Sequence, residues 1–295
     1  MKKALTFDIG GTKIYHTIID SDGNIVGEIE KHSTPKTLDG IKKIVQDAVD
    51  KYEFDVDTIG VSTAGAVNNK NTRVISSTGN LVENYRDFDF RTVSSLPVFV
   101  ENDANAAAWA EHVIGASKGC SYSVMLTLGT GVGGGIIVDS KLYKGKSGSA
   151  GEMHFKVYPD KRRKCTCGGF DCFEAYASGT GLKITAEEMT KNKNITTYDV
   201  IDGVNNGDKK MVEIFSVWQN NITSGIVGLA NLFDPDCVVL SGSMAQFVDT
   251  KQIEDEVNSQ IVTAKTSIRL ASAGNYSGMI GVGLLAINAL EVRHG

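Results

Sequence analysis

The residues with the clearest chemical potential are the polar side chains within Leu96–Trp109, LPVFVENDANAAAW. The apolar run at 98–100 predicts a buried strand, and the alanines after Asp103 predict a helix. Glu101, Asn102 and Asp103 therefore fall at a strand-to-helix turn, where polar side chains and free helix N–H groups face a ligand. Asp103 also suits the N-cap of that helix, because its carboxylate can accept the first free amide hydrogens. With a polar residue before it and small residues after it, we interpret Asp103 as a catalytic base.

Two turns rich in glycine and threonine have the composition of phosphate-binding loops: Asp8–Lys13 (DIGGTK) and 129–135 (GTGVGGG). Glycine has no Cβ, so backbone N–H groups can approach an anion closely, and Asp8 can hold Mg²⁺ through water. Strands are predicted around both turns, at 4–9, 14–19 and 25–29 and again at 124–128, 136–138 and 142–143. This repeated order predicts an internal duplication into two lobes whose tips grip a polyphosphate.

Two common nucleotide motifs do not explain these turns. A dinucleotide-binding GxGxxG must open a helix, whereas a β-branched run follows 129–135. The Walker pattern also fails, because the position five residues before Gly145 is Ser140 rather than glycine.

A cluster of cysteine and histidine has the spacing of a metal site. The pattern C-x-C-x₄-C follows a histidine by eleven residues, and the four potential ligands are His154, Cys165, Cys167 and Cys172. Such a set makes a closed, structural tetrahedral zinc site. The alternative is three unlinked buried cysteines in a reducing compartment. The total of five cysteines is odd, which favours metal over a disulfide framework.

Composition limits the kinds of partner. The chain is 41% hydrophobic and 22% charged, with a formal net charge of −5. The electrostatic field of such an acidic protein does not favour binding of nucleic acid. The basic run 161–164 (KRRK) is interpreted as a solvated loop. No apolar run reaches the roughly 18 residues that span a bilayer. The N-terminus lacks the apolar core of a signal peptide, so we expect a cytoplasmic protein.

The remaining pattern is mostly helical and completes an α/β fold in two lobes. Helices are predicted at 36–52, 178–190, 198–204, 208–232, 253–261 and 278–290, and further strands at 58–63, 237–240 and 268–271. The turn 241–243 (SGS) after a strand has the geometry of a nucleotide contact, and plain close packing explains it equally well. We expect a smaller lobe at 1–115, with the last helix (278–295) packing back on it, and a larger lobe at 116–277 that carries the zinc loop 154–172.

Taken together, the motifs resemble the ROK family of bacterial sugar kinases and sugar-responsive repressors. The motifs that carry the resemblance are DIGGTK, ENDANAAA, GTGVGGGII, the GE…H…CxCGxxxCxEAYASG stretch and VVLSGSMA. The resemblance implies the actin/hexokinase-like (ribonuclease H-like) fold, a duplicated two-lobe ATPase fold with a central cleft. It also implies ATP and Mg²⁺, a structural Zn²⁺, a small-molecule sugar substrate and a homodimer.

The resemblance also implies roles for individual residues. Asp103 would take the proton from the sugar hydroxyl as that oxygen attacks the γ-phosphate of ATP. The sugar ligands would be Gly65, Asn80, Asn102, Asp103, Glu152, His154 and Glu174. The residues around ATP and Mg²⁺ would be Asp8, Gly10, Gly11, Thr12, Thr130, Gly131, Gly242 and Ser243. Zinc would be bound by His154, Cys165, Cys167 and Cys172.

Two departures from the family pattern bear on the substrate. The family usually has Gly-Glu-x-Gly-His, whereas this chain has Gly151-Glu152-Met153-His154, one residue shorter. The loop that usually reads Pro-Gly-Pro-Val is here Ala64-Gly65-Ala66-Val67. The candidate base and the two phosphate tips predict phosphorylation of a hexose-type sugar, at the 6-hydroxyl. The two departures leave glucose, N-acetylmannosamine and a β-glucoside open as the substrate.

Two further hypotheses come from other functional classes. A sugar-sensing repressor needs a helix-turn-helix domain before the first motif, and only seven residues precede Asp8. A binding protein that has lost its kinase chemistry is disfavoured, because Asp103 and both glycine turns are intact. A coupled ADP-release assay across a panel of sugars separates this second hypothesis from the kinase.

Overall fold

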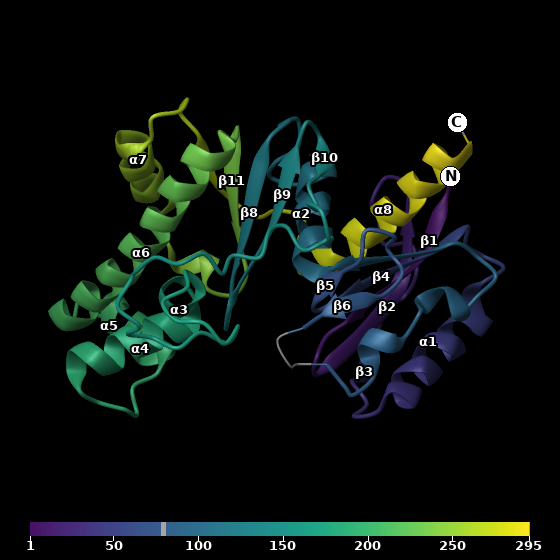
Figure 1. Ribbon diagram of the computed structural model, residues 1–295, viewed down its shortest axis with the longest axis horizontal. Coiled ribbons are helices and arrows are strands. Elements are labelled where there is room, and N and C mark those ends of the chain that lie inside the picture. Colours follow the sequence, from purple (N-terminus) through teal and green to yellow (C-terminus); the bar gives the residue numbers. More distant parts are fainter. Residues whose placement is uncertain (78–80, 295) are drawn as a thin grey trace. The chain divides into compact units, whose positions relative to one another are not determined.

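The computed structural model describes residues 1–77 and 81–294, so Asn80, a predicted sugar ligand, lies outside the described residues. The fold alternates strands and helices (Figure 1), as predicted for an α/β protein. The strands are β1 Lys3–Ile9, β2 Lys13–Asp20, β3 Glu30–Ser33, β4 Thr58–Thr63, β5 Ala66–Val67, β6 Val74–Ser76, β7 Val98–Asn102, β8 Ser123–Leu128, β9 Val132–Val138, β10 Lys141–Leu142, β11 Cys237–Ser241 and β12 Ser267–Leu270. The helices are α1 Leu38–Tyr52, α2 Asp103–Val113, α3 Glu174–Ala177, α4 Gly179–Thr190, α5 Thr197–Asn205, α6 Lys209–Phe233, α7 Thr250–Gln260 and α8 Ser277–His294.

The chain divides into two compact units. The first contains Met1–Gly119, Gly135–Gly151 and Ser272–Gly295, and the second contains Cys120–Gly134 and Glu152–Ala271. Within the described ranges, no helix combines the length and the apolar content that a membrane span requires.

The two five-stranded sheets have the same topology. The first has the order β3-β2-β1-β4-β7 and the second the order β10-β9-β8-β11-β12. In the first sheet β1 pairs antiparallel with β2 and parallel with β4, which in turn pairs parallel with β7. In the second, β11 lies parallel to both β8 and β12, and β10 is antiparallel to β9. The predicted internal duplication is therefore confirmed at the level of topology.

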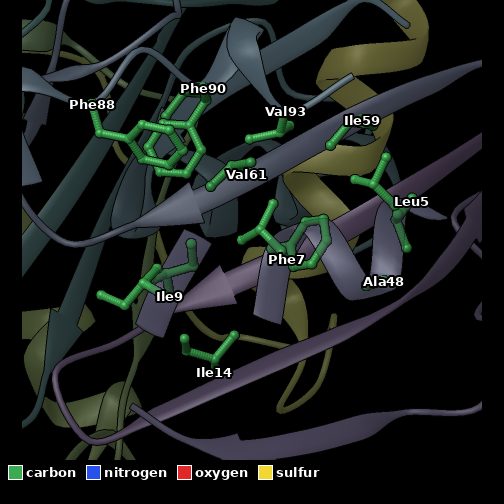
Figure 2. Close-up of a cluster of buried hydrophobic side chains, with 14 of the residues drawn as sticks. Leu5, Phe7, Ile9, Ile14, Ala48, Ile59, Val61, Phe88, Phe90 and Val93 are labelled. Atoms are coloured by element: carbon green, nitrogen blue, oxygen red, sulfur yellow. The ribbon is translucent and has the colours of Figure 1, made fainter. Parts of the chain in front are cut away.

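The core of the first unit forms between its sheet and α1. Alternate side chains of β1, namely Leu5, Phe7 and Ile9, point to one face, as the two-residue period of a strand requires. Figure 2 shows them meeting side chains from β4 and α1 and the aromatic rings of Phe88 and Phe90. Each fully buried side chain of this size contributes about 1.5–3 kcal/mol, so this cluster holds the strands in register.

The other face of the first sheet is covered by α8, which also packs against α2. A Cβ at Gly281 would lie 1.7 Å from the carbonyl oxygen of Ala106, and one at Gly60 would lie 2.8 Å from that of Val282. These contacts allow only glycine, because no side chain fits between the backbones. The two glycines therefore let α8 pack closely against α2 and the sheet.

Two predicted elements are wrong in detail. The strand predicted at 25–29 is absent as an extended strand: Ile25 forms an isolated bridge with Ile19, and the paired strand β3 begins at Glu30. In the second sheet, β9 begins at Val132, so Gly134 and Gly135 belong to a strand rather than to the glycine tip.

The two strand glycines are explained by packing. A Cβ on Gly134 would lie 2.3 Å from Cε of Met153, and one on Gly135 would lie 2.5 Å from Cβ of Ala108. Three residues of the predicted turn, Gly129, Thr130 and Gly131, therefore remain in the tip between β8 and β9.

Candidate active site

The turn between β7 and α2 is capped by Asn102. Its Oδ1 accepts hydrogen bonds from the backbone N–H groups of Ala104 (3.0 Å) and Asn105 (3.1 Å). The interpretation of Asp103 as the N-cap is therefore wrong, because Asn102 occupies that position. Asp103 is instead the first residue of α2, and its side chain is exposed with Oδ1 2.8 Å from the N–H of Ala104. Its carboxylate is held at a helix N-terminus, where negative charge is favoured.

The capped turn rests on the fully buried carboxylate of Glu101. Lys144 lies 2.8 Å from Oε2, and Asn71 donates to the same oxygen at 2.9 Å. The other oxygen accepts from the backbone N–H of Asn102 (2.9 Å) and from Nδ2 of Asn105 (3.2 Å). A buried charge is stable only when it is paired and hydrogen-bonded, and here those partners fix both sides of the turn. Sequence reasoning missed this role, because the partners are far apart in the chain.

Gly65 lies beside the same turn. Nδ2 of Asn102 donates to its carbonyl oxygen at 3.1 Å, so two of the predicted sugar ligands are in contact. Gly65 has a φ of +92°, and a Cβ there would lie 2.6 Å from the carbonyl oxygen of Ser76. Glycine is therefore required at this position.

Asp8 lies at the carboxyl end of β1, next to β4. Its Oδ1 accepts a hydrogen bond from Oγ of Ser62 at 3.0 Å. Burial raises the pKa of Asp8, and the Ser62 hydrogen bond opposes part of that shift. Asp8 is half-buried, and the described residues place no cation beside its carboxylate. Such a carboxylate can bind Mg²⁺.

The first glycine tip follows Asp8. The tip is held by Thr34, whose Oγ1 donates to the carbonyl oxygen of Gly10 at 2.7 Å and whose N–H donates to that of Thr12 at 3.1 Å. Gly11 and Thr12 are exposed, so their N–H and hydroxyl groups are open to solvent and available to a phosphate.

The second glycine tip is hydrogen-bonded to the start of α4 in the second unit. The N–H of Gly179 donates to the carbonyl oxygen of Gly129 (2.8 Å), and Oγ1 of Thr180 donates to that of Thr130 (2.7 Å). Both contacts come from the first turn of α4, whose N-terminus favours anions. The helix predicted at 178–190 is confirmed, with Ser178 as its N-cap, but sequence reasoning missed its contact with the glycine tip.

A cavity of about 320 Å³ opens beside this tip. Its lining comes from the tip, α4, α5 and the turn after β11: Gly129, Thr130, Gly179, Thr180, Lys183, Thr197, Tyr198, Ile201, Ser243, Met244, Gln246 and Phe247. The cavity combines a glycine tip and a lysine with aromatic and apolar walls, which is the chemistry of a nucleotide site. Of the predicted ATP ligands, Thr130 and Ser243 line it. Gly242, with a φ of +89°, forms the adjoining turn, where a Cβ would lie 2.4 Å from the carbonyl oxygen of Leu128.

Gly131 is in contact with Glu174. A Cβ at Gly131 would lie 2.4 Å from Oε2 of Glu174, and the same oxygen accepts from the N–H of Val132 at 3.1 Å. The other oxygen accepts from Oγ1 of Thr166, with Sγ of Cys165 at 3.5 Å. Glu174 thus links the cysteine loop to the glycine tip.

Replacement of Gly131 with alanine is expected to displace Glu174 and to lower kcat/KM for ATP by about 5- to 100-fold, since overpacking costs about 1–3 kcal/mol. Steady-state kinetics with varied ATP checks this. The matched control is Gly228→Ala in α6 of the same unit, where no atom lies within 4 Å of the added Cβ, so its kinetics should match the wild type. Equal losses in the two variants would contradict the role given to the Gly131–Glu174 contact.

The predicted metal ligands come together in the second unit. One ligand atom from each of His154, Cys165, Cys167 and Cys172 lies within 4.8 Å of all the others. Nδ1 of His154 is 3.5 Å from Sγ of Cys165, and the sulfur atoms of Cys167 and Cys172 are 3.5 Å apart. A disulfide would require about 2.05 Å, whereas sulfurs on one tetrahedral zinc are near this wider spacing. The donor set therefore fits zinc.

The cysteine loop is anchored below these ligands by a buried polar network. Tyr176 and the N–H groups of Arg162 and Arg163 donate to the carboxylate of Asp171. The Arg163 guanidinium donates in turn to Glu188 and Thr185 of α4. The loop is thus fixed to the helix whose N-terminus meets the second glycine tip.

His154 has a different partner on each ring nitrogen. Nδ1 faces Cys165, and Nε2 lies 3.6 Å from a carboxylate oxygen of Glu152. With Nδ1 bound to a metal, Nε2 would carry the proton and act as a donor. The shortened Gly-Glu-Met-His stretch therefore leaves one side of the imidazole directed at Glu152, another predicted sugar ligand.

The predicted site residues are divided between the two units. The first unit contains Asp8, Gly10, Gly11, Thr12, Gly65, Asn102 and Asp103, and the second contains Thr130, Gly131, Glu152, His154, Cys165, Cys167, Cys172, Glu174, Gly242 and Ser243. Within the first unit, Asn102 contacts Gly65. Within the second, the metal ligands, Glu174 and the glycine tip form one connected group.

The comparison with known proteins decides the family. A model described as "ROK family" matches residues 4–289. The chain belongs to the ROK family. The hexokinase-like α/β fold of this ROK chain is shared with solved members of the family.

Three similar proteins illustrate the range of the relatives. A glucokinase of Streptomyces coelicolor is 32% identical, with 95% of this chain and 96% of the relative covered. An N-acetylmannosamine kinase of Yersinia pseudotuberculosis is 29% identical over 98% of this chain and all of the relative. The structure of a ROK family glucokinase from Streptomyces griseus, in complex with glucose and AMPPNP, is 30% identical with a TM-score of 0.79, covering 97% of this chain and 99% of that chain.

Proposed function

We propose that this ROK protein is an ATP-dependent carbohydrate kinase that phosphorylates a hexose-type sugar, at the 6-hydroxyl. The observation that carries the proposal is the β7–α2 turn: Asn102 caps the helix, so the exposed carboxylate of Asp103 is not needed as the cap. The kinase activity of its relatives, which cover nearly the whole chain, supports the same conclusion.

Asp103 acts as the general base. The sugar oxygen forms a bond to the γ-phosphorus as the bond from that phosphorus to the ADP oxygen breaks, and the hydroxyl proton passes to the Asp103 carboxylate. A carboxylate is a weak base for an alcohol, but the proton leaves late, once the oxygen is bonding to phosphorus. Phosphoryl transfer mainly requires positioning, and Glu101 and Asn102 supply it by fixing the turn.

The two glycine tips and the 320 Å³ cavity hold the nucleotide. Gly10, Gly11, Thr12, Thr130 and Gly131 offer backbone N–H groups and hydroxyls to the phosphates, and Gly242 and Ser243 adjoin the adenosine. Asp8 holds Mg²⁺, which when bound neutralises charge on the phosphate oxygens.

Replacement of Asp8 with asparagine is expected to stabilise the free protein by about 1 kcal/mol while lowering kinase activity. The pKa of Asp8 is raised by burial, so the folded state binds the proton more tightly than the unfolded state. The wild type therefore loses stability as the pH rises through this raised pKa, and Asp8→Asn does not. Urea unfolding from pH 4 to pH 8 measures this. A variant as unstable as the wild type at pH 8 would contradict the prediction.

His154, Cys165, Cys167 and Cys172 hold a structural zinc. With all four positions taken by protein, the ion organises the loop rather than the reaction. The loop in turn positions Glu152, His154 and Glu174, which together with Gly65, Asn80 and Asn102 form the hydrogen-bonding set for the sugar. We further propose a cytoplasmic homodimer, which sedimentation and cell fractionation would test.

A coupled ADP-release assay tests the function. The panel contains glucose, N-acetylmannosamine and a β-glucoside, and the product is located on the sugar by NMR. Phosphorylation of any panel sugar at the 6-hydroxyl supports the proposal, and the preferred one identifies the substrate. Activity only on the β-glucoside would indicate the alternative kinase specificity. Sugar binding without sugar-dependent ADP release would contradict the kinase proposal and favour a non-catalytic sugar-binding regulator.

A further inference from the structure

A second cluster of potential metal ligands lies in the first unit, apart from the cysteine loop. It consists of His16 on β2 with Glu30 and His32 on β3, and one ligand atom from each lies within 4.8 Å of the others. β2 and β3 pair antiparallel with His16 opposite Glu30. Because alternate residues of a strand share a face, His32 lies on the same face as Glu30. The strand register therefore brings the three side chains together.

Three imidazole nitrogens of this cluster are buried without a hydrogen bond among the described residues. His16 is only 3% exposed, and neither of its ring nitrogens has a hydrogen-bond partner among the described residues. The same holds for Nε2 of His32. Nearly all buried polar atoms in native proteins find a partner, so three such nitrogens in one place require an explanation.

The arrangement has the chemistry of a metal site. The two rings are parallel, with an interplanar angle of 8° and centroids 5.3 Å apart, and Nε2 of His16 is 3.4 Å from Oε1 of Glu30. A neutral imidazole has a lone pair for coordination. Two imidazoles and one carboxylate are ligands that divalent first-row transition metals accept.

Glu30 is held in its ionised form by α1. Lys51 donates to Oε1 at 2.9 Å and Tyr52 donates to the same oxygen at 3.0 Å. The ammonium group of Lys51 therefore competes with a metal for this carboxylate.

We propose that His16, Glu30 and His32 form a binding site for a divalent first-row transition-metal ion, distinct from the cysteine loop. The site joins β2 to β3 beside the end of α1 and plays no part in the proposed phosphoryl transfer. Lys51 weakens it, because its positive charge lies on the same carboxylate oxygen that faces His16.

Titration of the full-length protein with Co²⁺ tests this site. The thiolates of the cysteine loop give sulfur-to-cobalt charge-transfer absorption, whereas two imidazoles and a carboxylate do not. Besides the Co²⁺ taken up by the cysteine loop with that absorption, the wild type is expected to bind one further Co²⁺ per chain without it. His32→Phe keeps a ring against His16 and removes the ligand. The Co²⁺ affinity should fall at least about 10-fold, because loss of even a residue that only supports a metal ligand costs that much.

Lys51→Met is expected to change the Co²⁺ affinity in the opposite direction. Removing the competing ammonium should raise Co²⁺ affinity, whereas a purely structural effect of either substitution would not increase binding. His112→Phe is the matched control, since His112 is a histidine with a buried unpartnered Nδ1 outside the cluster. If His32→Phe fails to fold, Glu30→Gln removes the carboxylate charge and should cause the same loss.

Two results would overturn the proposal. One is uptake of Co²⁺ only with thiolate charge transfer, which would mean that ordered water satisfies the buried nitrogens. The other is equal affinity in His32→Phe, Lys51→Met and His112→Phe.

Discussion

Replacement of Asp103 with asparagine is expected to lower kcat for sugar phosphorylation by about 10²–10⁴-fold, the usual contribution of a general base. Asparagine retains an oxygen that can accept from the N–H of Ala104, which lies 2.8 Å from Oδ1 of Asp103. Because Asn102 remains the N-cap, α2 should begin at the same residue. The KM for sugar should change by only a few fold, since the lost interaction belongs to the transition state. Steady-state kinetics at saturating ATP measures both constants.

The matched control for Asp103 is Asp39. It is also an exposed aspartate in the first turn of a helix, α1, in the same unit. Asp39→Asn should leave kcat unchanged and alter stability by no more than about 0.5 kcal/mol. An equal fall in kcat for both variants would show that the loss at Asp103 reflects helix stability and not proton transfer.

Replacement of Cys165 with serine is expected to abolish tight zinc binding at the cysteine loop and to destabilise the protein by more than about 3 kcal/mol. Cys165 is buried, and burial raises the pKa of its thiol to about 12. The ion must displace that proton, so zinc affinity should rise with pH. Zinc content after dialysis, the thiolate-to-cobalt absorption and the unfolding temperature measure the effect.

Disorder of the cysteine loop should also impair the use of ATP. Glu174 bonds Thr166 and Cys165 on the loop and the N–H of Val132 beside the glycine tip, so a disordered loop releases the tip. We expect kcat/KM for ATP to fall in Cys165→Ser. Cys120→Ser is the control, because Cys120 is buried against Cys237 outside the loop. Retained zinc and full stability in Cys165→Ser would contradict the structural role.

Much of the fold followed from the sequence because its signals are local. The strand at 58–63, the helix after Asp103 and the long helix ending at Asp234-Pro235 each carry their own periodicity and stop residues. The repeat of strand, tip and strand was visible without sequence identity, since both copies need the same turn chemistry. The cysteine loop was identified for the same reason: its ligands, apart from His154, lie within eight residues.

The remaining features of the fold and the site depend on contacts between residues far apart in the chain, which a local sequence pattern cannot predict. Asparagine and aspartate are equally good N-caps, so the choice between Asn102 and Asp103 needed backbone geometry. The strand glycines at 134 and 135 are required by Met153 and Ala108, not by an anion. The buried partners of Glu101 and the pairing of His16 with Glu30 and His32 become evident only once the strands are in register.

The most direct test of the central claim is a rapid-quench measurement of a single turnover, with enzyme in excess over radiolabelled ATP at saturating sugar. We predict that the wild type forms phosphorylated sugar in one fast phase and that Asp103→Asn forms it at least about 100-fold more slowly. Nucleotide and sugar binding should be unchanged in the variant. A fast phase of equal rate in Asp103→Asn would contradict the assignment of Asp103 as the base.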